Sequence, residues 1–147
     1  MFRVFSSAFA EGGWIPRLHT CDGADVSPSV EWSEEPRDTR SFALLVEDPD
    51  APRGVWTHWM LYDIPRAVRT LAQGVARVGL AGRNDFGRAG YGGPCPPPGD
   101  PHRYYFRLMA MRVEKLGIAE GATRAEFDRA ISGKVVGEAV YMGRYRR

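Results

Sequence analysis

The sequence has no long hydrophobic run, little net charge and only two cysteines. A transmembrane helix needs about 18 or more consecutive apolar residues, so none is predicted. The formal net charge is +2 and the basic residues are spread along the chain, which argues against a nucleic-acid partner. Residues Met1–Ala10 form too short an apolar segment for a secretory signal, so we expect a cytoplasmic protein in which Cys21 and Cys95 are free thiols.

Lysine is also scarce, because 2 lysines stand against 18 arginines. This bias is typical of a GC-rich genome, and it also suits bidentate binding of anions by guanidinium groups. The one basic cluster in the sequence is Arg144–Arg147, which we expect to be a solvated terminus.

Glycine and proline are abundant, with 17 glycines and 11 prolines among 147 residues. Such a density of turn residues favours many short strands over a helix bundle. A chain of this length fits one domain, and we expect residues 1–147 to form it.

Hydrophobic patterns predict several strands and one helix. The expected strands are residues 41–47, 55–64, 104–113 and 138–145, each apolar or alternating and bounded by turn residues. Alternation in the second strand puts His58, Met60, Tyr62 and Ile64 on one face. A capping box at Thr123 and Glu126 predicts a short helix before Gly133, and residues 80–101 are expected to form an ordered functional loop.

Two histidines and two aspartates lie beside predicted turns. Asp48 and Asp50 end one strand, the next strand brings His58 back, and His102 follows a separate turn. A nearby carboxylate favours imidazolium, so both histidines could donate to a phosphate or carboxylate. For the aspartates, plain turn chemistry is an equal alternative, and a lone His on an apolar face is more often a core residue.

The loop around residue 93 could complete an anion site. The backbone N–H groups of Gly92, Gly93 and Gly99 are candidate donors. The prolines between these glycines cannot donate, but they stiffen the loop and lower the entropy cost of holding it open.

Two other chemistries have less support in the sequence. Two His and two Asp could bind a metal, but no closely spaced ligand pair is present, so no metal or cofactor is expected. Cys95 and His102 could act as nucleophile and base, yet no nucleophile-elbow motif surrounds Cys95.

A series of short motifs resembles the phosphatidylethanolamine-binding proteins, also called Raf kinase inhibitor proteins, and their short bacterial and archaeal branch in particular. The resemblance extends from about Cys21 to the C-terminus. The motifs are Cys21-Asp22-Gly23, Ser27-Pro28, Trp32, Asp48-Pro49-Asp50-Ala51-Pro52, Trp56-Thr57-His58-Trp59, Gly82-Arg83-Asn84-Asp85-Phe86-Gly87, Tyr91-Gly92-Gly93-Pro94-Cys95-Pro96-Pro97 and His102-Arg103-Tyr104.

The resemblance implies a mostly β fold, a Greek-key antiparallel β-sandwich with one or two short helices. It also implies a shallow pocket for phosphate, acetate or a phosphoethanolamine-like group, and a cis peptide between Ala51 and Pro52. The ligand-binding residues expected from the resemblance and from the residues themselves are Asp48, Asp50, Trp56, His58, Gly92, Gly93, Pro94, His102 and Tyr104.

Three functional hypotheses follow. The first is a non-enzymatic binding protein with no catalytic residues, which could regulate a kinase or a protease through the rim of the pocket. The second is a hydrolase that uses Asp48 with His58 or His102 as acid and base, although the sequence supplies no clear nucleophile. The third is an interaction module, because the resemblance also implies a homodimer.

Overall fold

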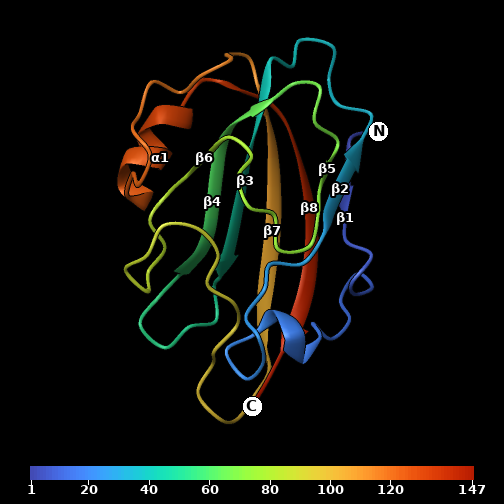
Figure 1. Cartoon of the computed structure of the whole chain (residues 1–147), viewed down its shortest axis with the longest axis vertical. Helices are drawn as coiled ribbons and strands as arrows, with labels where there is room; N and C mark the ends of the chain where they lie inside the picture. The colour runs from blue at the N-terminus through green and yellow to red at the C-terminus, as the bar shows by residue number, and fades with distance from the viewer.

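The computed structural model describes residues 1–147 and consists mainly of antiparallel strands in two sheets with one α-helix (Figure 1). The mostly β sandwich expected from the sequence is confirmed. The small sheet has the order β1-β2-β5 and the large sheet the order β6-β4-β3-β7-β8. The elements are β1 (Arg3–Phe5), η1 (a 3-10 turn, Arg17–His19), β2 (Val30–Ser33), β3 (Ser41–Asp48), β4 (Trp56–Pro65), β5 (Thr70–Leu71), β6 (Leu80–Ala81), β7 (His102–Met111), α1 (Arg124–Ile131) and β8 (Val135–Tyr145).

Strand β3 lies in the middle of the large sheet, between β4 and β7, and is buried on both faces. Phe42, Leu44 and Val46 point into the core between the two sheets, whereas Ala43 and Leu45 point into a second core that contains Phe127 of α1. This double burial explains why β3 reads as a continuous apolar run rather than as an alternating one. In Figure 1, α1 and the small sheet accordingly lie on opposite sides of the large sheet.

Two irregularities in the pairing of β3 with β4 change which way side chains point. Val46 pairs with Trp59 and Glu47 with Thr57, so His58 is an extra residue on β4. A second shift lies near Asp63, whose φ is +56°, and it turns Ile64 into the core between the sheets. The expectation that Ile64 shares a face with Met60 is therefore wrong, because a bulge reverses the alternation.

The predicted helix is confirmed at Arg124–Ile131. The Thr123 side chain accepts a hydrogen bond from the Glu126 N–H, and the Glu126 carboxylate accepts one from the Thr123 N–H, which completes the capping box. The long predicted strands are also present, with ends that differ by a few residues. The very short strands β5 and β6, of two residues each, were not predicted.

The two cysteines form a disulfide, which corrects the expectation of free thiols. Cys21 and Cys95 are 74 residues apart in sequence, but the fold brings their Cα atoms to 5.4 Å. The free thiols were expected from a cytoplasmic location, and a disulfide is the state typical of an oxidising compartment, so it gives that location no support. No helix is long and apolar enough to cross a membrane.

The basic C-terminal cluster is only partly solvated. Arg144 belongs to β8 and its guanidinium lies 4.5 Å from the ring centroid of Trp14. Arg147 forms an ion pair with Asp22 at 3.2 Å. The expected free terminus is instead anchored, because β8 continues to Tyr145 and its edge is covered by the segment around Gly13.

Candidate functional site

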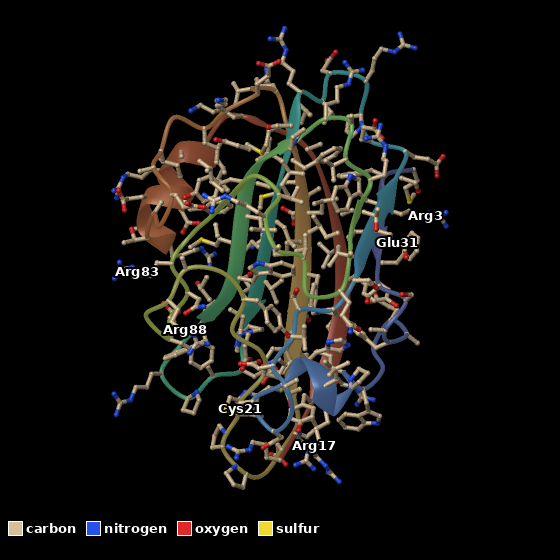
Figure 2. All side chains as sticks on the ribbon, viewed as in Figure 1. Arg3, Arg17, Cys21, Glu31, Arg83 and Arg88 are labelled. Atoms are coloured by element: carbon tan, nitrogen blue, oxygen red, sulfur yellow. A yellow bond between two sulfur atoms is a disulfide. The ribbon has the colours of Figure 1, made fainter.

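A cavity of about 170 Å³ lies at the end of the sandwich where β3 ends and where β4 and β7 begin. This is the lower end of the molecule in Figure 1, and Figure 2 shows Cys21 in the loops of the same end. The lining of the cavity is mainly apolar, with a few polar groups. The lining residues are Asp48, Ala51, Pro52, Trp56, His58, Phe86, Cys95, Pro96, Pro97, His102 and Tyr104.

Asp48 and His102 form a buried pair at the wall of the cavity. Nδ1 of His102 lies 2.7 Å from Oδ2 of Asp48, and the side chains are 11% and 4% exposed. The other carboxylate oxygen of Asp48 accepts a hydrogen bond of 2.7 Å from the N–H of Asp50. Because the Asp48 carboxylate accepts a hydrogen bond from Nδ1 of His102, the imidazole ring is held in one orientation. Nε2 of His102 makes no hydrogen bond within the protein.

His58 has a different hydrogen-bond partner, the backbone of the Gly92 loop. Its Nδ1 donates to the carbonyl oxygen of Gly92 at 2.6 Å, and the residue is 3% exposed. Burial lowers the pKa of His58 below its usual value, against smaller opposing effects of the Gly92 carbonyl and the Asp48 charge. The expected imidazolium at His58 is therefore corrected: the ring is neutral at neutral pH, and Nε2 presents a lone pair.

The Tyr104 hydroxyl is a buried donor without a partner. Tyr104 is 1% exposed, and its hydroxyl lies close to the Asp48 carboxylate but without the geometry of a hydrogen bond. Burial, reinforced by the Asp48 charge, raises the pKa of Tyr104 well above its usual value, so the hydroxyl keeps its proton. The indole N–H of Trp56 is likewise buried and unpaired. Unpaired buried donors are rare in folded proteins and call for an explanation.

Phe86 is positioned beside His58 by hydrogen bonds between the Asn84 side chain and the backbone of its loop. Asn84, which is 2% exposed, accepts from the N–H groups of Phe86 and Arg88 and donates to the carbonyl of Gly90. The Phe86 ring packs edge-on at 5.5 Å from the ring of His58 and at 5.4 Å from that of Trp56. The loop motif that begins at Gly82 thus positions one apolar wall of the cavity.

Four predicted site residues do not line the cavity: Gly92, Gly93, Pro94 and Asp50. The N–H of Gly92 donates to the His58 carbonyl at 2.9 Å, and that of Gly93 donates to Asp25 at 2.9 Å. The N–H of Gly99, the third expected donor, donates to the Arg147 carbonyl at 3.3 Å. All three donors are used within the protein, so the expected cradle of backbone amides at this loop is wrong. A β-carbon on Gly92 would collide with the Phe86 ring, so this glycine serves the close approach of the loop. Pro94 only accepts a hydrogen bond, from the Cys21 N–H.

Asp50 also points away from the cavity. Its carboxylate binds the Arg103 guanidinium through both oxygens, at 2.8 and 2.9 Å, and it accepts the backbone N–H of the same residue. These hydrogen bonds lower the pKa of Asp50. Asp50 therefore ties the turn after β3 to the start of β7. The peptide between Ala51 and Pro52 is trans, which corrects the cis bond implied by the resemblance.

The comparisons with known proteins agree with this fold. A model of the family described as phosphatidylethanolamine-binding protein matches residues 5–146. The chain belongs to this family. A UPF0098 protein of Aquifex aeolicus is 46% identical, over all of this chain and 90% of its own, and one of Methanothermobacter thermautotrophicus is 43% identical, over 95% of each.

Two solved structures of family members superpose closely. A putative phosphatidylethanolamine-binding protein homologue of Chlamydia trachomatis has a TM-score of 0.92 at 38% identity, with 99% of this chain and 97% of that chain covered. E. coli YbcL has a TM-score of 0.93 at 35% identity, with 99% and 98% covered.

In this family member, sequence reasoning found the polar residues of the cavity but missed most of its apolar lining. Phe86 belongs to one of the motifs of the resemblance but is not among the predicted ligand-binding residues, and Pro96 and Pro97 are predicted only to stiffen the loop, yet all three line the cavity. A signal was present for Phe86, because a large aromatic residue between Asp85 and Gly87 in a turn-rich loop needs a surface to bury it. No cluster of three or more potential metal ligands is found.

Proposed function

We propose that this protein is a non-enzymatic binding protein whose cavity holds a single anionic group, a phosphate, a carboxylate or the phosphoryl part of a phosphoethanolamine-like molecule. The observation that carries the proposal is the Tyr104 hydroxyl, which is 1% exposed at the cavity and has no partner within the protein. A buried donor of this kind costs free energy unless a ligand accepts from it.

The cavity offers complementary polar groups for such a ligand. Nε2 of His102 donates a hydrogen bond when both ring nitrogens carry a proton, while Nδ1 donates to Asp48. The Tyr104 O–H is a donor at any physiological pH. Nε2 of neutral His58 is an acceptor, which suits a hydrogen carried by the ligand, such as the O–H of a monoanionic phosphate. The apolar walls, Phe86 and Pro97 among them, keep water away from these bonds and strengthen them.

The size of the cavity limits the ligand. Pockets for drug-sized molecules usually measure roughly 300 to 1,000 Å³, whereas this one measures about 170 Å³. A phosphoryl or carboxylate head group fits such a space, and acyl chains do not. Any lipid bound here would therefore insert its head group only.

A binding role is favoured over the alternative hydrolase for a chemical reason. Cys95, the cavity-lining residue that could have served as a nucleophile, is oxidised in the disulfide with Cys21. Regulation of a kinase or a protease through the rim of the cavity, and a homodimeric state, are carried by the family resemblance alone.

The test compares two neighbouring tyrosines by calorimetric titration with acetate and with inorganic phosphate. Tyr104→Phe removes the unpaired hydroxyl at the cavity and should weaken binding about tenfold, because a hydrogen bond to a charged group contributes roughly 1.5 to 3 kcal/mol. Tyr105→Phe is the matched control, since Tyr105 follows on the same strand, does not line the cavity, and contacts Arg103 through its hydroxyl at 3.2 Å. Its affinity should stay within twofold of wild type.

The stability of the free protein supplies a second readout. Tyr104→Phe deletes a polar atom that has no partner, so the ligand-free variant should be as stable as wild type or more stable. If Tyr104→Phe binds both anions with wild-type affinity, the hydroxyl does not contact a ligand. If the variant is also less stable than wild type, the hydroxyl contributes to the fold instead.

A further inference from the structure

A second hollow lies at the opposite end of the sandwich from the cavity. It is an open groove of about 420 Å³ between the start of β3, the end of β4 and the end of β7. This end is at the top of Figure 1. The groove is lined by Arg37, Asp38, Thr39, Arg40, Arg66, Arg112 and Val136, so four arginines face one acidic residue. We refer to it below as the arginine groove.

The four arginines are exposed, and their guanidinium groups form no ion pair or hydrogen bond within the protein. Three arginines on the strands and the helix are paired instead: Arg103 with Asp50, Arg107 with Glu47 and Glu138, and Arg124 with Glu47 and Asp128. Acidic residues are therefore available to the fold, but only Asp38 lines the groove and it pairs with none of the four. Uncompensated like charges repel one another, so this concentration of cations is a cost to the folded state.

The backbone of the arginine groove is well fixed. The N–H of Arg40 donates to the Met111 carbonyl at 2.8 Å, and that of Arg112 donates to the Lys134 carbonyl at 2.8 Å. Thr39, which is 1% exposed, donates its hydroxyl to the Pro36 carbonyl at 2.7 Å. The arginines thus project from strand ends with set positions, so little backbone ordering would be needed on binding.

The composition of the groove selects a class of ligand. Guanidinium groups bind phosphate and carboxylate oxygens as two-pronged donors. No aromatic side chain lines the groove and Val136 is its single apolar residue, so nothing offers a nucleobase a surface to stack on. The neighbouring hollow shares Arg40 and Arg66 and adds Lys115 with Asp63 and Glu114, so positive charge is concentrated in the arginine groove itself. We propose that the arginine groove binds a compact anion that carries two or more phosphoryl groups.

This site is separate from the cavity. Ser41 begins β3 beside the groove and Asp48 ends it at the cavity, and seven residue steps of about 3.3 Å put the two places on the order of 20 Å apart. The two proposals can therefore fail independently. A variant that disables the cavity should leave the groove intact.

The probe is inorganic tripolyphosphate, titrated by calorimetry into the full chain, with phosphate and citrate at matched ionic strength for comparison. We expect tripolyphosphate to bind at least tenfold more tightly than either. The double variant Arg40→Gln with Arg66→Gln should lose at least tenfold in affinity for tripolyphosphate. The matched control is Arg53→Gln with Arg83→Gln, which removes the same charge from two exposed arginines that do not line the groove, Arg53 lying in the turn after β3 at the cavity end. It should change affinity less than twofold, as should His102→Ala.

Three results would overturn the proposal. Equal losses in the two double variants would mean that net charge alone attracts the anion. Phosphate binding that is as tight as that of tripolyphosphate and that falls in the Arg40→Gln, Arg66→Gln variant would remove the case for several phosphoryl groups. Citrate binding that is equally tight and equally dependent on these arginines would remove the case for phosphoryl chemistry. Thermal unfolding of the groove variant checks the fold, and a midpoint at or above that of wild type is expected because no partner is lost.

Discussion

The two ends of the sandwich use their polar residues in opposite ways. At the cavity, Asp48, His58 and His102 are nearly buried and each has a protein partner at 2.6 or 2.7 Å. At the arginine groove, the charged side chains are exposed and unpartnered. The polar residues of the cavity therefore contribute both to the fold and to any ligand site, whereas those of the groove contribute little to the fold.

This difference predicts how each end responds to substitution. Removing a hydrogen-bonded polar residue at the cavity, such as Asp48, should cost stability, because a buried partner is left unsatisfied. The unpaired Tyr104 hydroxyl is the exception. Removing a polar residue at the groove should cost nothing, because a repulsion is relieved. The substitutions below test this contrast in order of decreasing effect on the free energy of unfolding.

The largest effect is expected from the disulfide at the cavity end. Cys21 and Cys95 are separated by 74 residues, and closing a loop of that length restricts the unfolded chain by about 4 kcal/mol in the chain-entropy view. The double variant Cys21→Ser with Cys95→Ser should lose roughly that much in urea denaturation. Wild type treated with reductant should lose the same amount, and a loss below about 1 kcal/mol in both would show that the contacts of this end hold without the bond.

The next largest effect is expected at Asp48. Asp48→Ala leaves Nδ1 of His102 and the N–H of Asp50 without their acceptor, and should destabilise the protein by about 3 kcal/mol. Asp50→Ala is the control, because it removes a neighbouring carboxylate whose partner Arg103 is 49% exposed and should cost about 1 kcal/mol or less. Equal losses in urea denaturation would mean that burial does not distinguish the two aspartates.

Features that depend on neighbouring residues could be predicted from the sequence, whereas features that depend on contacts between distant residues could not. Strand β3 and helix α1 were predictable, since a run of buried residues and a capping box lie within a few neighbouring positions. The bulge at His58 was not, because it depends on the register with β3. The disulfide was not, because only the fold brings residues 74 apart together.

The two sites also differ in how far they could be predicted from the sequence. Asp48, His58, His102 and Tyr104 stand beside recognisable turns, so their meeting at one strand end could be expected. The arginine groove draws on separate segments between residues 37 and 136, and each of its arginines looks ordinary in the sequence. Basic residues that are spread along the sequence therefore come together only in the folded chain.

A smaller, pH-dependent effect is expected from His58. Because burial lowers the pKa of His58 in the folded state, the unfolded chain binds a proton below about pH 6.5 that the folded chain does not. The free energy of unfolding should therefore fall as the pH drops below 6.5, by up to about 1.4 kcal/mol per pH unit, and this contribution should be level above 6.5. Urea denaturation from pH 5 to 8 should show a shallower slope in His58→Gln, and parallel curves would mean that His58 takes up its proton in the folded state as readily as in the unfolded one.

The smallest effect, and the one with the opposite sign, is expected at the arginine groove. Arg66→Gln removes an exposed charge that has no partner and that lies with Arg37, Arg40 and Arg112, so the free energy of unfolding should rise by about 0.3 kcal/mol at low salt. The matched control is Arg69→Gln, three residues away, because Arg69 pairs with Glu35 and with backbone carbonyls and its loss should destabilise by up to about 1 kcal/mol. Near 1 M salt the gain in Arg66→Gln should disappear, since charges are then screened beyond about 3 Å. If Arg66→Gln destabilises the protein as much as Arg69→Gln does, the groove arginines contribute to the fold after all, and the contrast between the two ends of the sandwich does not hold.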